Sequence, residues 1–127
     1  MNFSAKTPVK LVYKNKVYNS EIQYSNSILY ASVFTEEQDV FVFCVDNVSC
    51  SVEFKELSQE FLLTSLEKDF MPVALYEFFL CVGSDFKTEL YDESSGICSL
   101  TRDFGGVKVT LEALQKESII EYTIEIN

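Results

Sequence analysis

The sequence has 127 residues, of which 47% are hydrophobic and 14% aromatic, and this predicts a single globular domain over residues 1–127. A chain of this length buries roughly two thirds of its unfolded surface, so it needs no disulfide or structural metal. Its 20 acidic residues against 10 basic ones give a net charge of −10, which argues against direct binding to nucleic acid or to an anionic membrane.

The first half of the chain has the pattern of a β-meander. Four apolar or alternating runs predict strands, at residues 9–14, 17–24, 28–34 and 40–45. The last of these is apolar on both faces, which is typical of a central strand. Asp46 and Asn47 predict a two-residue hairpin turn, because both residues tolerate positive φ. Residues 48–55 alternate as the returning strand.

The apolar period then changes to that of a helix. Spacing at Leu57, Phe61, Leu62 and Leu66 predicts a first helix, with Ser58 as its cap. A second helix follows, with Asp69 as its cap, Pro72 in its first turn and Gly83 as its stop. The apolar residues of the second helix cover a wide arc, so we expect it to be buried against a sheet.

The β pattern resumes in the last third of the chain. Strands are predicted at 86–91, 97–101 and 107–112, with turns at 92–96 and 102–106. Residues 119–126 fit a strand or a helix, and their β propensity favours a strand. The layout predicts an α+β fold, a small antiparallel β-sandwich or barrel with a helix-turn-helix inserted between strands.

No residue pattern nominates a catalytic or metal site. The chain has no His, which excludes His-based triads and common zinc sites, and it has no glycine-rich phosphate loop. Adjacent carboxylates at Glu36-Glu37 and Asp92-Glu93 lie in predicted turns, where solvated charges are ordinary. We therefore expect a protein that is not an enzyme and has no cofactor or metal.

The cysteines and the N-terminal residues bear on location. Four cysteines without a C-x-x-C pattern predict buried free thiols and a reducing compartment, and they are Cys44, Cys50, Cys81 and Cys98. The first residues lack the apolar run of a signal peptide, and no stretch approaches the ~20 apolar residues of a membrane span. We expect a cytoplasmic protein.

Phe104 is the most unusual residue of the predicted turns. It is flanked by Arg102-Asp103 and Gly105-Gly106. A polar, glycine-rich turn does not require a large aromatic residue. The ring either folds back onto its own sheet or projects into a pocket on a partner, and interface aromatics commonly do the latter. From these residues alone, local packing is favoured.

Three stretches of the sequence resemble a known superfamily. They are 28–54, the helical segment 68–81, and 98–111 with its late hairpin, and the resemblance covers about residues 9–116. The chain is similar to the globular heads of centriolar cartwheel scaffolds and end-joining DNA-repair scaffolds. Those heads are small β-sandwiches with a helix-turn-helix, followed by a coiled coil. The coiled coil would begin near 115–118, where this sequence favours a strand.

The resemblance implies a function for the Phe104 turn. In cartwheel heads, the matching turn residue inserts into a pocket on another head, so Arg102, Asp103, Phe104, Gly105 and Gly106 would form a weak homodimer contact. Val45, Phe54 and the helix that carries Phe79 are candidates for the pocket by their apolarity. Burying one Phe is worth roughly 1.5–3 kcal/mol, so such a contact is weak alone.

Three functional hypotheses follow. The first is a cartwheel-type scaffold head, at the centriole or cytoskeleton, that binds itself and other scaffold proteins. The second is an end-joining repair scaffold head in the nucleus, which recruits protein partners. The third rests on the net charge of −10 and is an acidic inhibitor or immunity-type protein that neutralises a basic partner.

Overall fold

The computed structural model describes residues 3–34, 40–84, 90–92 and 96–127. Most of them belong to one ten-stranded sheet with the strand order β6-β5-β4-β3-β2-β1-β10-β9-β8-β7. The strands of its first half are β1 (Thr7–Tyr13), β2 (Lys16–Ser25), β3 (Ile28–Phe34), β4 (Val40–Val45), β5 (Ser49–Phe54) and β6 (Leu57–Leu62). Those of its second half are β7 (Leu90–Asp92), β8 (Ile97–Phe104), β9 (Val107–Lys116) and β10 (Ile119–Ile126).

The sheet is mixed rather than antiparallel throughout. Neighbouring strands pair antiparallel except β1 and β10, which run parallel, with Val9 level with Tyr122 and Tyr13 level with Ile126. This pairing joins the meander β1–β6 to the meander β10–β7. The α+β class is confirmed, with strands dominant. Within the described residues the order runs from β6 at one end to β7 at the other, so the sheet is open, and the β1–β10 pair makes it mixed where an antiparallel one was predicted.

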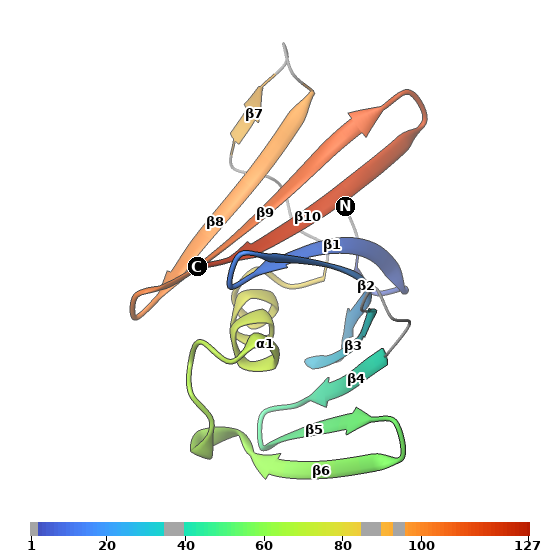
Figure 1. Cartoon of the computed structure of the whole chain (residues 1–127). Coiled ribbons are helices and arrows are strands. Elements are labelled where there is room, and N and C mark those ends of the chain that lie inside the picture. Colours follow the sequence, from blue (N-terminus) through green and yellow to red (C-terminus); the bar gives the residue numbers. More distant parts are fainter. Residues whose placement is uncertain (1–2, 35–39, 85–89, 93–95) are drawn as a thin grey trace.

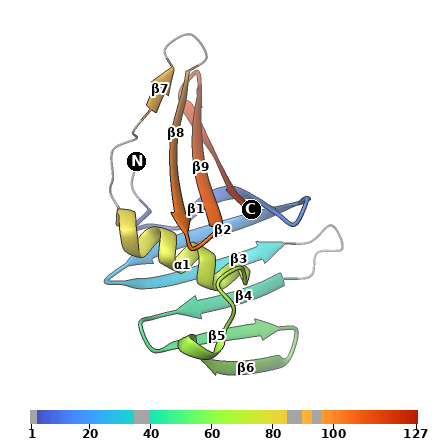
Figure 2. The same cartoon turned by 90° about the vertical axis from the view of Figure 1, so that its left-hand side faces the viewer.

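The sheet bends around one helix, α1 (Met71–Val82), which lies on its inner side between the two meanders (Figures 1 and 2). The helix contacts β3 and β4 from one meander and β8 and β9 from the other. Its residues 72–76, 78 and 79 are all buried. A helix that is apolar on nearly every side must be enclosed, and the bend in the sheet provides that enclosure.

Aromatic rings fill the space between helix and sheet. Phe3, fully buried, meets Phe79 of α1 and Tyr122 of β10 edge to face, with ring centroids 5.2 and 5.1 Å apart. Tyr24 of β2 stacks on Phe79 from another side at 5.5 Å. Such pairs add to the stability that comes from burying apolar area. The core thus joins α1, both meanders and the N-terminal segment.

The predicted first helix is wrong. Residues 57–62 form strand β6, paired with β5 from Phe54 opposite Leu57 to Ser49 opposite Leu62. A short 3₁₀ turn, η1 (Leu63–Ser65), follows. The spacing of Leu57 and Phe61 that indicated a helix also places both residues on one face of a strand. Pairing with β5 decides between the two structures, so the helix-turn-helix reduces to one helix.

The second helix is confirmed in its extent but not in its cap. Pro72 lies in its first turn and Gly83 is its C-terminal cap, with φ of 81°. The N-cap residue is Phe70 rather than Asp69, and no side chain caps the first turn. Proline there needs no N–H partner, which lowers the need for a capping side chain.

The turn after β4 differs in mechanism from the prediction. Neither Asp46 nor Asn47 has a positive φ. The Asp46 side chain instead accepts hydrogen bonds from the backbone N–H groups of Val48 and Ser49, both at 2.8 Å. The strand at the C-terminal end is confirmed as β10. Residues 86–89 of the predicted strand 86–91 and residues 93–95 of the predicted turn 92–96 lie outside the described residues, as do Glu36 and Glu37.

Candidate interaction surface

Phe104 is the last residue of β8 rather than part of a turn. It pairs with Val107, and only Gly105 and Gly106 lie between the two strands. Both glycines have positive φ, 64° and 95°, as the tightest hairpin turns require. The predicted five-residue turn 102–106 is therefore too long, because strand pairing continues through Arg102 and Asp103.

The Phe104 ring is half-buried and packs against the hydrophobic core of its own chain. Strand alternation places it on the same face as buried Leu100, which is the side that faces α1. It lines a pocket of about 270 Å³ whose other lining residues are Lys68, Ala74, Glu77, Gly105 and Val107. Much of the ring is thus already in contact with the protein.

The polar neighbours of Phe104 have local partners. The Asp103 carboxylate accepts a hydrogen bond from the Gly106 N–H at 2.9 Å, which stabilises the turn. The Arg102 guanidinium donates to the carbonyl of Thr101 at 2.9 Å. These contacts explain why Asp and Arg occupy these positions without requiring a binding partner.

A second surface, which the sequence did not indicate, lies at the other end of the sheet. Phe41, Phe54 and Leu57 sit side by side on β4, β5 and β6, in register with one another, and we call them the apolar strip. The rings of Phe41 and Phe54 stack with centroids 4.4 Å apart. Leu57 is 75% exposed and Phe41 is 37% exposed. The strip continues the helix-facing side of the sheet past the end of the core.

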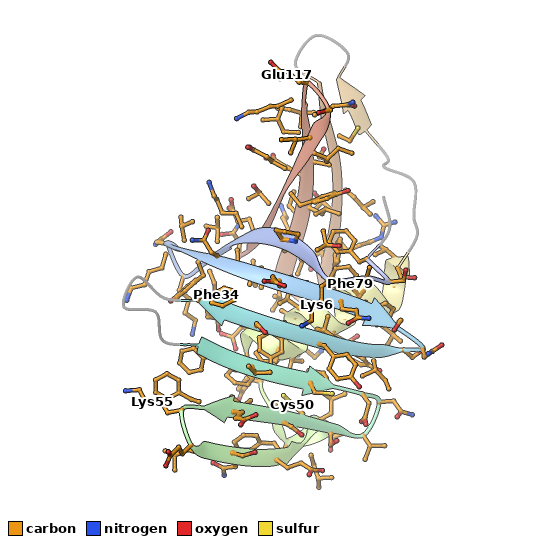
Figure 3. The ribbon with its side chains drawn as sticks, turned by 90° about the vertical axis from the view of Figure 1, so that its right-hand side faces the viewer. Lys6, Phe34, Cys50, Lys55, Phe79 and Glu117 are labelled. Carbon is orange, nitrogen blue, oxygen red and sulfur yellow. The ribbon has the colours of Figure 1, made fainter. Side chains whose placement is uncertain are left out.

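A lysine marks the rim of this strip. Lys55 lies in the hairpin between β5 and β6, as Figure 3 shows, and its ammonium group is 5.2 Å from the centre of the Phe54 ring. Among the expected pocket candidates, Val45 is fully buried, as is Phe79 on the candidate helix, which exposes Leu80. Phe54 is half-buried and belongs to the strip. The sequence does not indicate the strip, because the spacing of residues 57–62 predicts a helix and so does not place Leu57 beside Phe54.

The four cysteines are free. Cys50 is fully buried, and burial raises the pKa of its thiol to about 11. Cys44 and Cys98 are half-buried, whereas Cys81, at the end of α1, is exposed, so the expectation of buried thiols is wrong for Cys81. A thiol with a raised pKa is a poor nucleophile at neutral pH, and Cys50 is therefore suited to packing rather than chemistry.

Among the described residues, no three Cys, Asp or Glu side chains come together as the ligands of a metal ion would. Within the same part of the chain, no helix has the length and apolarity to cross a membrane. No family model, curated protein or solved structure matches this chain.

Proposed function

We propose that this domain is a non-catalytic scaffold module that works through weak self-association. The observation that carries the proposal is the apolar strip at the end of the sheet. Leu57 is 75% exposed and Phe41 is 37% exposed there, beside strand β6, whose outer edge pairs with no other strand among the described residues. An apolar patch next to an unpaired strand edge is favourable only when another surface covers it.

The Phe104 hairpin is the contact that the resemblance to cartwheel heads implies. Its ring packs against the core of its own chain, so it has less free apolar surface to offer than the strip has. We therefore propose the strip as the main contact and the Phe104 hairpin, with Arg102, Asp103, Gly105 and Gly106, as a secondary one. The link to centriolar assembly rests on the resemblance alone.

Sedimentation of the purified chain over a range of concentrations tests the proposal. We expect reversible dimerisation, which Phe41→Ser weakens because it removes a ring from the strip. Val17→Ser is a matched control, since Val17 is 60% exposed on β2, far from the strip in strand order. Thermal unfolding of each variant shows whether the fold is retained.

The same experiment compares the two candidate surfaces. If Phe104→Ser abolishes dimerisation while Phe41→Ser leaves it intact, the head-to-head contact of the cartwheel type is the correct one. If the wild-type chain stays monomeric at every concentration, self-association is not its function.

A second candidate function is the capture of a basic protein, and the net charge of −10 favours it. Salt distinguishes the two functions. Binding of an oppositely charged partner weakens as salt screens the attraction, whereas two acidic copies repel each other and associate more strongly at high salt. Self-association that strengthens between low and high salt therefore supports the scaffold function.

A further inference from the structure

The end strand β6 has only one of the features by which proteins protect a sheet edge, the charged residue Glu60. In the described part of the chain it pairs only with β5. Its sequence, LSQEFL, contains no proline or lysine, and none of its residues has the positive φ that often marks a bulge. Leu57 and Leu62 are 75% and 64% exposed. An edge with one charge and exposed leucines can serve as a template for another strand.

The alternation of hydrogen bonds between β5 and β6 shows which backbone groups of β6 point toward β5 and which point toward the free edge. The Leu63 N–H donates to the Val48 carbonyl at 2.9 Å, which extends the ladder one step beyond Ser49 and Leu62. Antiparallel pairs alternate, so Leu57, Gln59 and Phe61 direct their backbone groups toward β5. Ser58 and Glu60 direct theirs toward the free edge, as does Leu62, whose carbonyl already accepts a hydrogen bond from the Ser65 hydroxyl at 2.7 Å.

We propose that β6 pairs antiparallel with β6 of a second copy, on a two-fold axis that passes through Gln59. This inference rests on the proposed self-association and specifies its geometry. Ser58 of each copy would lie opposite Glu60 of the other as a hydrogen-bonded pair, and the two Gln59 residues would face each other as a non-hydrogen-bonded pair.

The charge pattern of β6 selects this register. Two edge strands form hydrogen bonds only where residues whose backbone groups face the free edge lie opposite each other, and such residues alternate along β6. The two-fold axis must therefore pass through a residue and not between two residues. Axes through Gln59 and through Glu60 give the greatest overlap. The Glu60 axis would place two carboxylates directly opposite each other, which is destabilising. The Gln59 axis places each Glu60 opposite the uncharged Ser58 instead.

The apolar residues favour the same register. On the inner face, Leu57 of one copy would lie opposite Phe61 of the other. The apolar strip of Phe41, Phe54 and Leu57 would then continue into Phe61 and Cys50 of the second copy, because those residues already pair across β5 and β6. Each copy's exposed Leu57 thereby gains the other copy's Phe61 as a cross-strand partner. A second copy of this chain has the complementary residues at these positions, so no other protein is needed as the partner.

Cysteine cross-linking tests the register. In a Cys81→Ser background, which removes the exposed native thiol, Gln59→Cys places two thiols on the axis. Their Cα atoms would be about 4.5 Å apart, within the range of a disulfide. Glu60→Cys is the matched control, since its Cα atoms would be roughly 8–9 Å apart in this register. We expect a covalent dimer from Gln59→Cys and little or none from Glu60→Cys under mild oxidation.

Proline substitution tests the use of the edge itself. Ser58→Pro removes an N–H that faces the free edge and leaves the β5–β6 hydrogen bonds in place. We expect it to weaken dimerisation by about tenfold or more, with little change in the melting temperature. Glu60→Gln should change dimerisation little, because Glu60 faces Ser58 in this register. Strong enhancement by Glu60→Gln would indicate the axis through Glu60.

The outcomes separate this inference from the proposed function. A chain that dimerises, but with equal cross-linking at residues 59 and 60 or with no effect of Ser58→Pro, overturns the β6 interface and leaves self-association intact. A wild-type chain that is monomeric at all concentrations overturns both. Should Ser58→Pro fail to fold, the cross-linking comparison alone decides, because Gln59 and Glu60 are surface positions on β6.

Discussion

The ring of Phe3 meets the ring of Phe79 edge to face, with centroids 5.2 Å apart, and so joins the N-terminal segment to the helix. Backbone hydrogen bonds hold Phe3 on both sides. Its N–H donates to the Ser84 carbonyl and its carbonyl accepts from the Tyr24 N–H, each at 2.7 Å. Phe3 therefore belongs to the core even though it lies two residues from the start of the sequence.

Phe3→Ala should lower the free energy of unfolding by about 3–5 kcal/mol, because it leaves a cavity among Phe79, Tyr122 and the sheet. Denaturant unfolding measures the change. Val17→Ala, at an exposed position of β2, should change it by less than about 0.5 kcal/mol. A loss under about 1 kcal/mol for Phe3→Ala would mean that the N-terminal segment is not part of the cooperative core.

Gly83→Ala should lower the free energy of unfolding by about 1–3 kcal/mol through backbone strain alone. Gly83 has φ of 81° and ψ of −175°, a region that only glycine occupies readily. Apart from its two chain neighbours, no atom of the described residues lies within 4 Å of an added Cβ, so the expected loss comes from the local backbone. Gly105→Asn is the comparison, since its φ of 64° is one that Asn tolerates, and its loss should be smaller. Equal losses would contradict this explanation.

Cys81 should be the first thiol to react with an alkylating reagent at pH 8, and Cys50 the last. Cys81 is exposed at the end of α1. Cys50 is inaccessible, and burial raises its pKa to about 11, so almost no thiolate is present. Mass spectrometry of peptides over time gives the order. Modification of Cys50 before global unfolding would show that β5 opens locally.

Asp46→Ala should destabilise the β4–β5 hairpin at neutral pH, because two backbone N–H groups lose their acceptor. The same N–H groups hold the pKa of the Asp46 carboxyl below its usual value of 3.8. Because the pKa of Asp46 is lowered in the folded state, its stabilisation of the hairpin is complete above pH 3.8 and is lost as pH falls through the folded pKa. Thermal melts at pH 7 and near pH 2 should therefore show a smaller difference between variant and wild type in acid. A difference that does not depend on pH would indicate that the charge plays no part.

Elements whose signals are local can be predicted from the amino-acid sequence. Strands 28–34 and 40–45 were predicted with the bounds they have, because alternation or continuous apolarity matched a strand and no helix of that length competes. The second helix follows from Pro72 and Gly83, whose backbone preferences act within one turn, although its N-cap is Phe70 and not the predicted Asp69.

Tertiary structure alone decided the rest. Residues 57–62 carry apolar spacing that fits a helix or a strand, and only the pairing with β5 makes them the strand that ends the sheet. The direction of Phe104 depends on the core and on α1, whose Ala74 and Glu77 line the same pocket. The parallel pairing of β1 with β10 joins segments more than a hundred residues apart. These contacts have no local signature, because the residues that make them meet only when the sheet bends around the helix.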